Sequence, residues 1–179
     1  MSTFNRTVSL GAIAILFATV TATASAATPK PTATKNPYGA SQQVDPAGPN
    51  DILLTVTNRS KIVKLSLNSL RKLGTSQISI YEPFVKVRQT FTVVPLAKIF
   101  KLANIPGSAT IISDALNDYI YTNTAKNFTD SNGQLAIARF GGPIPYDQGG
   151  PIRIIFPDKT PLAANLNAWN WSLDILKVK

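Results

Sequence analysis

Hydrophobic and polar residues alternate in short runs from residue 51 onward, which is typical of strands that bury one face. Residues 84–94 (FVKVRQTFTVV) are the clearest case, because Val85, Val87 and Phe91 share one face while lysine, arginine and threonine occupy the other. Turn residues separate the runs, as Asn58-Arg59-Ser60 does between the first two. The predicted strands are residues 52–57, 61–65, 77–81, 84–94, 109–113, 119–122, 134–139, 152–156 and 169–178.

Two segments repeat their hydrophobic residues at helical spacing instead. Leucine recurs at every third position within residues 66–73, and Gly74 stands where a helix of that length would end. Pro95 begins the second segment, residues 95–103, because proline is favoured in the first turn of a helix. Many strands with two short helices predict a β-rich α+β domain.

The first 50 residues lack these patterns. Arg6, the apolar run of residues 8–20 and the small residues Ala24-Ser25-Ala26 predict a signal peptide over residues 1–26. The apolar run is shorter than the roughly 20 residues of a membrane span, so we expect no stable span, and an uncleaved anchor is the alternative. Residues 27–50 are rich in proline and threonine and predict a disordered tether. We therefore expect an exported protein, periplasmic or extracellular, whose folded domain is residues 51–179.

The chain contains no cysteine and no histidine. Their absence excludes disulfides, thiolate chemistry, the common zinc sites, Ser-His-Asp and Cys-His catalysis, and haem ligation by either residue. Oxygen-ligand sites for calcium or magnesium remain open, but Asp130-Ser131-Asn132-Gly133 offers a single carboxylate. This segment predicts a turn, and we expect no metal site.

Charge is distributed unevenly along the chain. Residues 59–101 contain nine basic residues and one acidic residue, a net charge of +8, whereas residues 102–179 contain six of each. A basic side of the fold would attract an acidic protein, an acidic surface or an anionic small molecule. The alternative is a solvated surface that only keeps the protein soluble. We expect no nucleic-acid binding, because the basic segment lacks an aromatic ladder that stacks bases.

A double glycine followed by proline occurs twice within residues 139–157 (RFGGPIPYDQGGPIRIIFP). These residues fit either two tight turns or an ordered loop that forms a binding surface. In the second reading, Gly149 and Gly150 would allow backbone N–H groups to approach an anion. Arg139 and Arg153 flank the loop, which makes both candidate ligand-binding residues.

Arg153 lies within a run of isoleucine and phenylalanine, so its guanidinium needs a partner. The partner is either an anionic ligand or a carboxylate such as Asp118 or Asp147. Asn117, Asp118 and Tyr119 form a polar corner between two strands. The corner either binds a heterocyclic ligand through its amide, carboxylate and ring, or only shapes the turn. Trp169 and Trp171 are predicted to anchor the core.

Four segments, in this order, carry a family resemblance: residues 65–73 (LSLNSLRKL), 91–105 (FTVVPLAKIFKLANI), 115–119 (ALNDY) and 149–157 (GGPIRIIFP). Together they resemble the oxidoreductase molybdopterin-binding domain of the sulfite oxidase type, over residues 52–178. The resemblance implies that fold. Catalytic members hold molybdenum with a pterin dithiolene and one cysteine thiolate, and this chain has no cysteine to supply it.

We therefore expect a non-catalytic module, exported and without a cofactor, that binds a ligand or a partner protein. One alternative is an oxidoreductase subunit that binds a molybdopterin-type cofactor without a protein thiolate. Another alternative is a basic adhesion module for acidic lipid or polyanion. The candidate binding residues are Asn117, Asp118, Tyr119, Arg139, Gly149, Gly150 and Arg153.

Overall fold

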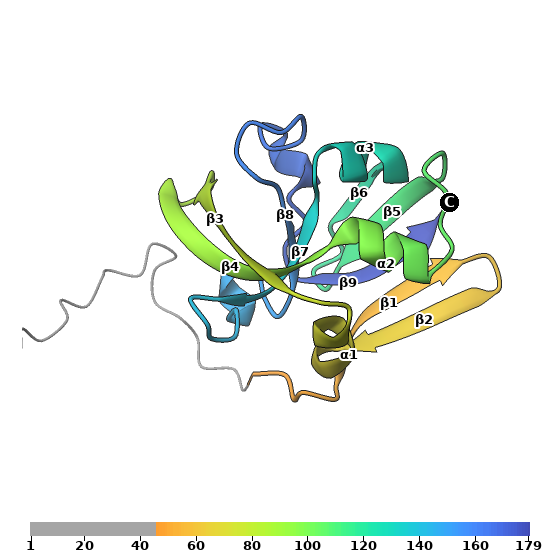
Figure 1. Ribbon diagram of the computed structural model, residues 1–179, viewed down its shortest axis with the longest axis horizontal. Helices are drawn as coiled ribbons and strands as arrows, with labels where there is room; N and C mark the ends of the chain where they lie inside the picture. Colours follow the sequence, from red (N-terminus) through yellow and green to blue (C-terminus); the bar gives the residue numbers. More distant parts are fainter. Residues whose placement is uncertain (1–45) are drawn as a thin grey trace, which may run out of the picture. The chain divides into compact units, whose positions relative to one another are not determined.

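Two β-sheets and three short helices make up residues 46–179, the part of the chain that the computed structural model describes (Figure 1). The predicted signal peptide and most of the predicted tether lie outside the described residues. No helix within residues 46–179 is long and apolar enough to cross a membrane. The predicted fold class, β-rich α+β, is confirmed.

The larger sheet has five strands in the order β2-β1-β9-β5-β6. β1 and β2 form the hairpin predicted around Asn58-Arg59-Ser60, and β5 pairs antiparallel with both β6 and β9. β9 pairs in parallel with β1 and so joins the two hairpins. The bounds are β1 Ile52–Asn58, β2 Lys61–Ser66, β5 Thr110–Ala115, β6 Ile120–Thr124 and β9 Leu173–Val178.

The smaller sheet has four antiparallel strands in the order β3-β4-β7-β8. Strands β7 and β8 are buried along almost their whole length, which explains their continuous apolar sequences. β3 alternates, so that Ile80 and Glu82 both point inward. The bounds are β3 Ser76–Glu82, β4 Val87–Pro95, β7 Gln134–Arg139 and β8 Arg153–Ile155.

The helices are short and amphipathic, with six or seven residues each, and they close the core. Ser66 caps α1 by accepting a hydrogen bond from the N–H of Ser69, and Thr124 caps α3 in the same way. α2 packs on β4 and α3 on β6, and the two helices lie against each other, so they bridge the sheets (Figure 1). The bounds are α1 Leu67–Lys72, α2 Leu96–Leu102 and α3 Ala125–Asp130, with two 3₁₀ turns at Tyr146–Gln148 and Leu166–Ala168.

Three predictions about individual elements were wrong. Helix α3 was not expected, and the strand predicted over residues 84–94 begins only at Val87. Residues 83–86 form a turn, because the Glu82 carboxylate accepts a hydrogen bond from the N–H of Val85 at 2.9 Å and competes with strand pairing. The strand predicted from residue 169 begins at Leu173, after Ser172 adopts a left-handed backbone (φ 51°).

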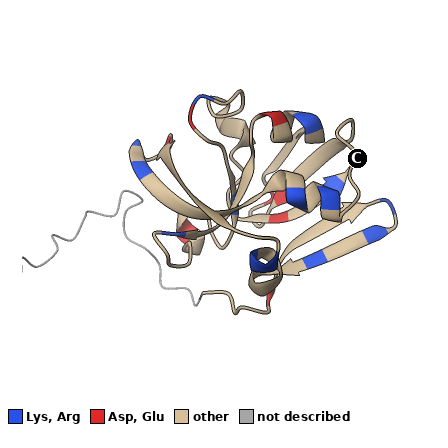
Figure 2. Ribbon diagram, in the orientation of Figure 1, with Lys and Arg blue, Asp and Glu red and all other residues tan. Residues whose placement is uncertain are grey.

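Basic residues gather on the β1–β2 hairpin and on helices α1 and α2, as Figure 2 shows. This region corresponds to most of the basic segment of residues 59–101. Acidic residues lie mainly elsewhere, on turns and on α3 (Figure 2).

Candidate functional site

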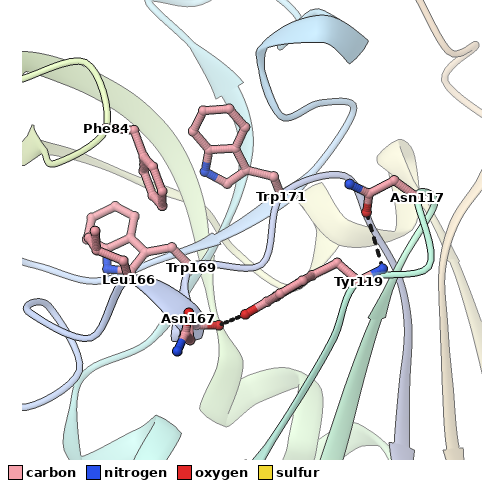
Figure 3. Close-up of a pocket in the computed structure, with 7 residues that line it drawn as sticks. All are labelled: Phe84, Asn117, Tyr119, Leu166, Asn167, Trp169 and Trp171. Carbon is pink, nitrogen blue, oxygen red and sulfur yellow. Dashed lines mark hydrogen bonds between the residues drawn. The ribbon is translucent and has the colours of Figure 1, made fainter.

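A pocket of about 280 Å³ opens where the β3–β4 turn, the β5–β6 corner and the segment before β9 meet (Figure 3). None of the residues that line it is charged. Aromatic rings dominate one side and amide side chains the other. The lining residues are Phe84, Asn117, Tyr119, Leu166, Asn167, Trp169 and Trp171.

Three rings form the aromatic side. Phe84 meets Trp171 edge to face at 4.9 Å between ring centroids, and meets Trp169 at 6.4 Å. Trp169 is buried and donates its indole N–H to the carbonyl of Ala163 at 3.1 Å, so its ring is fixed. Phe84 is 43% exposed at the tip of the β3–β4 turn. The turn that interrupts the predicted strand therefore places Phe84 in the pocket wall.

The polar side consists of Asn117, Tyr119 and Asn167. The Tyr119 hydroxyl donates to the carbonyl of Asn167 at 2.9 Å, which ties the β5–β6 corner to the segment before β9 (Figure 3). Asn117 Oδ1 accepts from the N–H of Tyr119 at 3.4 Å. Within residues 46–179, no group accepts a hydrogen bond from Asn117 Nδ2, and none bonds to the side-chain amide of Asn167, whose backbone N–H donates to Asn165 Oδ1. Both amides are therefore available to a ligand.

A buried ion pair supports the aromatic side. Arg153 Nη2 donates to Glu82 Oε1 at 2.7 Å, and both side chains are fully buried. The guanidinium carbon lies 4.2 Å from the centroid of the Trp171 ring and 5.7 Å from that of Phe91. Glu82 also accepts from Val85, next to Phe84, so one carboxylate organises both the turn and the arginine. The sequence predicted a carboxylate partner such as Asp118 or Asp147, and the structure shows Glu82, which was not named, as a carboxylate bound to Arg153.

Gln148 joins the two arginines of the loop. Its side-chain oxygen accepts from Arg139, and its backbone carbonyl accepts from Arg153 Nη1 at 3.4 Å. Gln148 is itself buried. Arg139 and Arg153 are thus held by the interior of the loop, and neither lines the pocket.

The second double glycine serves close packing. The N–H of Gly149 donates to the carbonyl of Tyr146 and that of Gly150 to the carbonyl of Pro145, so both donors are used within the loop. A Cβ on Gly149 would lie 2.8 Å from the Trp171 ring, and one on Gly150 would lie 1.9 Å from the Ile144 carbonyl oxygen. The expected anion cradle at these two N–H groups is therefore not what the loop forms.

The structure brings together only some of the predicted site residues. Asn117 and Tyr119 line the pocket, whereas Asp118 between them is exposed, occupies a left-handed turn position (φ 63°) and does not. Gly149 and Arg153 contact Trp171 from within the protein. Trp169 belongs to the core as predicted, but Trp171 is half-buried and lines the pocket.

Sequence reasoning assigned Trp169 and Trp171 to the core alone, and it did not name four other residues of the site: Phe84, Leu166, Asn167 and Glu82. Glu82 had a readable signal, because it continues the inward positions of Ile78 and Ile80 at strand spacing. The others lie on turns, where the sequence has no period that fixes side-chain direction.

A molybdenum–pterin group fits these residues poorly. No thiolate exists anywhere in the chain to ligate the metal, and residues 46–179 contain no cluster of three or more His, Cys, Asp or Glu side chains. The phosphate of such a cofactor needs a cation, and the pocket lining has none. The pocket suits a flat uncharged ring instead.

No family model and no curated protein matches the chain. Among solved structures, it is similar to the sulfane dehydrogenase SoxCD from Paracoccus pantotrophus, with a TM-score of 0.57 and 13% identity. The similarity covers 74% of this chain and 39% of that chain, so the chain spans well under half of its neighbour's length. The likeness shows the fold alone, a β-rich α+β domain similar to part of that enzyme.

Proposed function

We propose that this chain is an exported, non-catalytic module on a sulfite oxidase-type fold, which binds a neutral ring-shaped ligand in the pocket of Figure 3. The observation that carries the proposal is the uncharged lining of aromatic rings and free amides, in a chain without cysteine or histidine. Support for export comes from the signal-like pattern of residues 1–26.

The lining matches the chemistry of such a ligand. Phe84 and Trp171 offer apolar surface to a ring, and aromatic contacts of this kind add about 0.5–1.5 kcal/mol beyond area burial. The amides of Asn117 and Asn167 present both donors and acceptors, which matches the edge of a heterocycle with ring nitrogens and a carbonyl. A volume of about 280 Å³ admits one or two fused rings and little else.

The alternative, an oxidoreductase subunit with a molybdopterin-type cofactor, is supported by the likeness to sulfane dehydrogenase. The residues of the pocket support it less, since they supply neither the soft ligand nor the cation that the cofactor needs. A binding role therefore accounts for more of the site than turnover does.

Intrinsic fluorescence tests the proposal directly, because the two tryptophans of the chain, Trp169 and Trp171, both line the pocket. Titration with pterin, a neutral two-ring heterocycle, is expected to give saturable quenching. Asn117→Leu should weaken pterin binding about tenfold, as for the loss of one hydrogen bond. Asn68→Leu, on the exposed face of α1, is the matched control and should leave affinity unchanged.

Two outcomes would contradict the proposal. Absence of saturable quenching by pterin would remove the ring-binding assignment. Stoichiometric molybdenum in protein purified from its native host would favour the oxidoreductase alternative instead.

A further inference from the structure

Among residues 46–179, one face of the five-stranded sheet is covered and the other face is open. Inward residues such as Leu54, Val56, Ile111 and Leu176 are buried in the core. At the alternating positions, Leu53, Ser66 and Leu173 are buried at one end of their strands, and the other residues are half-buried or exposed. The strand registers align these outward residues in two rows that cross all five strands.

We define the open face by these two rows. The first row reads Ile62, Thr57, Lys177, Ile112 and Thr122 across β2, β1, β9, β5 and β6. The second reads Lys64, Thr55, Ile175, Asp114 and Ile120 in the same strand order. Isoleucine, threonine and lysine therefore alternate over a broad sheet surface.

Apolar side chains on the open face are substantially exposed. Ile62 is 61% exposed and Ile120 is 55% exposed, at opposite edges of the sheet. Ile112 and Ile175 lie between them and are half-buried. An exposed apolar surface of this width on a sheet indicates a site of contact with a protein or a membrane.

Four cations of this region form no ion pair with any residue in the described part of the chain. Lys64 and Lys177 belong to the open face, and Arg59 and Lys61 stand at the tip of the same hairpin (Figure 2). The ion pairs of Arg88, Lys126 and Arg153 involve none of these four side chains. Asp114 is the single acidic residue of the two rows. The surface is therefore both apolar and cationic.

We propose that the open face binds the surface of an anionic lipid bilayer. The partner must carry negative charge to match the cations, which disfavours a second copy of the same basic surface. A protein interface would concentrate aromatic, methionine and arginine side chains at its centre and avoid lysine. Here Lys177 stands on the central strand and neither row contains an aromatic residue.

A bilayer surface suits this combination. Isoleucine and threonine methyl groups enter the boundary between headgroups and acyl chains, while lysines extend along them toward the phosphates. Each lysine or arginine near an anionic leaflet strengthens binding about fivefold. The proposal does not depend on the ligand pocket. The pocket lies at the β5–β6 corner, and the tip of the β1–β2 hairpin lies toward the opposite end of these strands.

A single labelled cysteine tests which face meets the membrane, because the chain has none of its own. Ile62→Cys, carrying an environment-sensitive dye, should shift to the blue and brighten with vesicles of equal parts phosphatidylglycerol and phosphatidylcholine. Val87→Cys places the same dye on an exposed residue of the four-stranded sheet and should not respond. Neutral phosphatidylcholine vesicles should affect neither.

Charge variants of the full chain, compared by co-sedimentation with vesicles, test the electrostatic contribution to membrane binding. Lys64→Gln with Lys177→Gln should weaken binding to the anionic vesicles about 25-fold. The control is the double variant Lys86→Gln with Lys159→Gln, which changes the net charge by the same amount at exposed positions off the open face. It should weaken binding to the anionic vesicles by about twofold or less. Equal loss in both pairs, a response from Val87→Cys, or equal binding to neutral vesicles would overturn the proposal.

Discussion

The buried pair of Glu82 and Arg153 gives the sharpest prediction about stability. Glu82→Gln keeps the shape of the side chain, and its amide oxygen still accepts from the N–H of Val85. It removes the negative charge 2.7 Å from a guanidinium that is completely shielded from water. Loss of one member of a buried pair costs about 3–5 kcal/mol, a large share of the 5–15 kcal/mol of a typical domain.

Urea unfolding at neutral pH, followed by circular dichroism, measures this loss. In thermal unfolding, a loss of about 3–5 kcal/mol in unfolding free energy lowers the melting temperature of a domain of this size by about 12–20 °C. The double variant with Arg153→Met removes both charges, and the methionine packs against Trp171 and Phe91 where the guanidinium lay. We expect the double variant to be more stable than Glu82→Gln alone, because no charge remains buried.

The control is Asp158→Asn, which breaks the exposed ion pair with Arg88 and should cost about 1 kcal/mol or less. If Glu82→Gln costs no more than this control, the reasoning is refuted. Additive losses in the double variant would also refute it, since they would mean that the two charges are not coupled.

Two further predictions concern the loops. Gly150→Ala should destabilise the protein by about 3 kcal/mol or more in urea unfolding, because its Cβ would overlap the backbone of Ile144. The Cβ of Gly141→Ala would meet no atom within 4 Å, so this variant should lose only about 1–2 kcal/mol, the cost of its positive φ. Equal losses of stability in the two variants would contradict the packing argument. The hydrogen bond from the Tyr81 N–H, followed by the Arg88 side chain, lowers the pKa of Asp158 below its ordinary value of 3.8. The ionised carboxylate therefore stabilises the fold at neutral pH, and this stability is lost as the pH falls through the lowered pKa. Wild type and Asp158→Asn should therefore differ in unfolding free energy at pH 7 and converge near about pH 2, and a difference that persists in acid would contradict the sign.

Much of the fold follows from local patterns in the sequence. The β1–β2 hairpin, α1, α2 and β7 agree with their predicted positions within a few residues, because each has a clear period and recognisable turn or cap residues. Helix α3 had such a signal too, namely Thr124 as a cap followed by Ala125 and Phe128 three residues apart. Helix α3 is only six residues long, so its pattern was not distinguished from the polar residues around it.

The site was harder to predict, for a physical reason. Asn117 and Tyr119 were identified from a polar corner, but the pocket forms only when that corner meets Phe84 and Leu166 from distant turns. Turn residues have no repeating side-chain direction, and tertiary packing alone decides where they point. Arg153 was expected to need a partner. Glu82 lies 71 residues away on the opposite edge strand of the four-stranded sheet, so only tertiary packing brings the two side chains together.

The position of β9 in the five-stranded sheet has a consequence for the order of folding. β9 is made after the other strands, yet it is the central strand that joins the β1–β2 hairpin to the β5–β6 hairpin. The two hairpins can form early from local contacts, but no strand holds them together until residues 173–178 arrive. The two hairpins of a growing chain therefore remain unjoined until β9 has been made. For a chain proposed to cross a membrane before it folds, late completion of the five-stranded sheet keeps the polypeptide unfolded enough to be translocated.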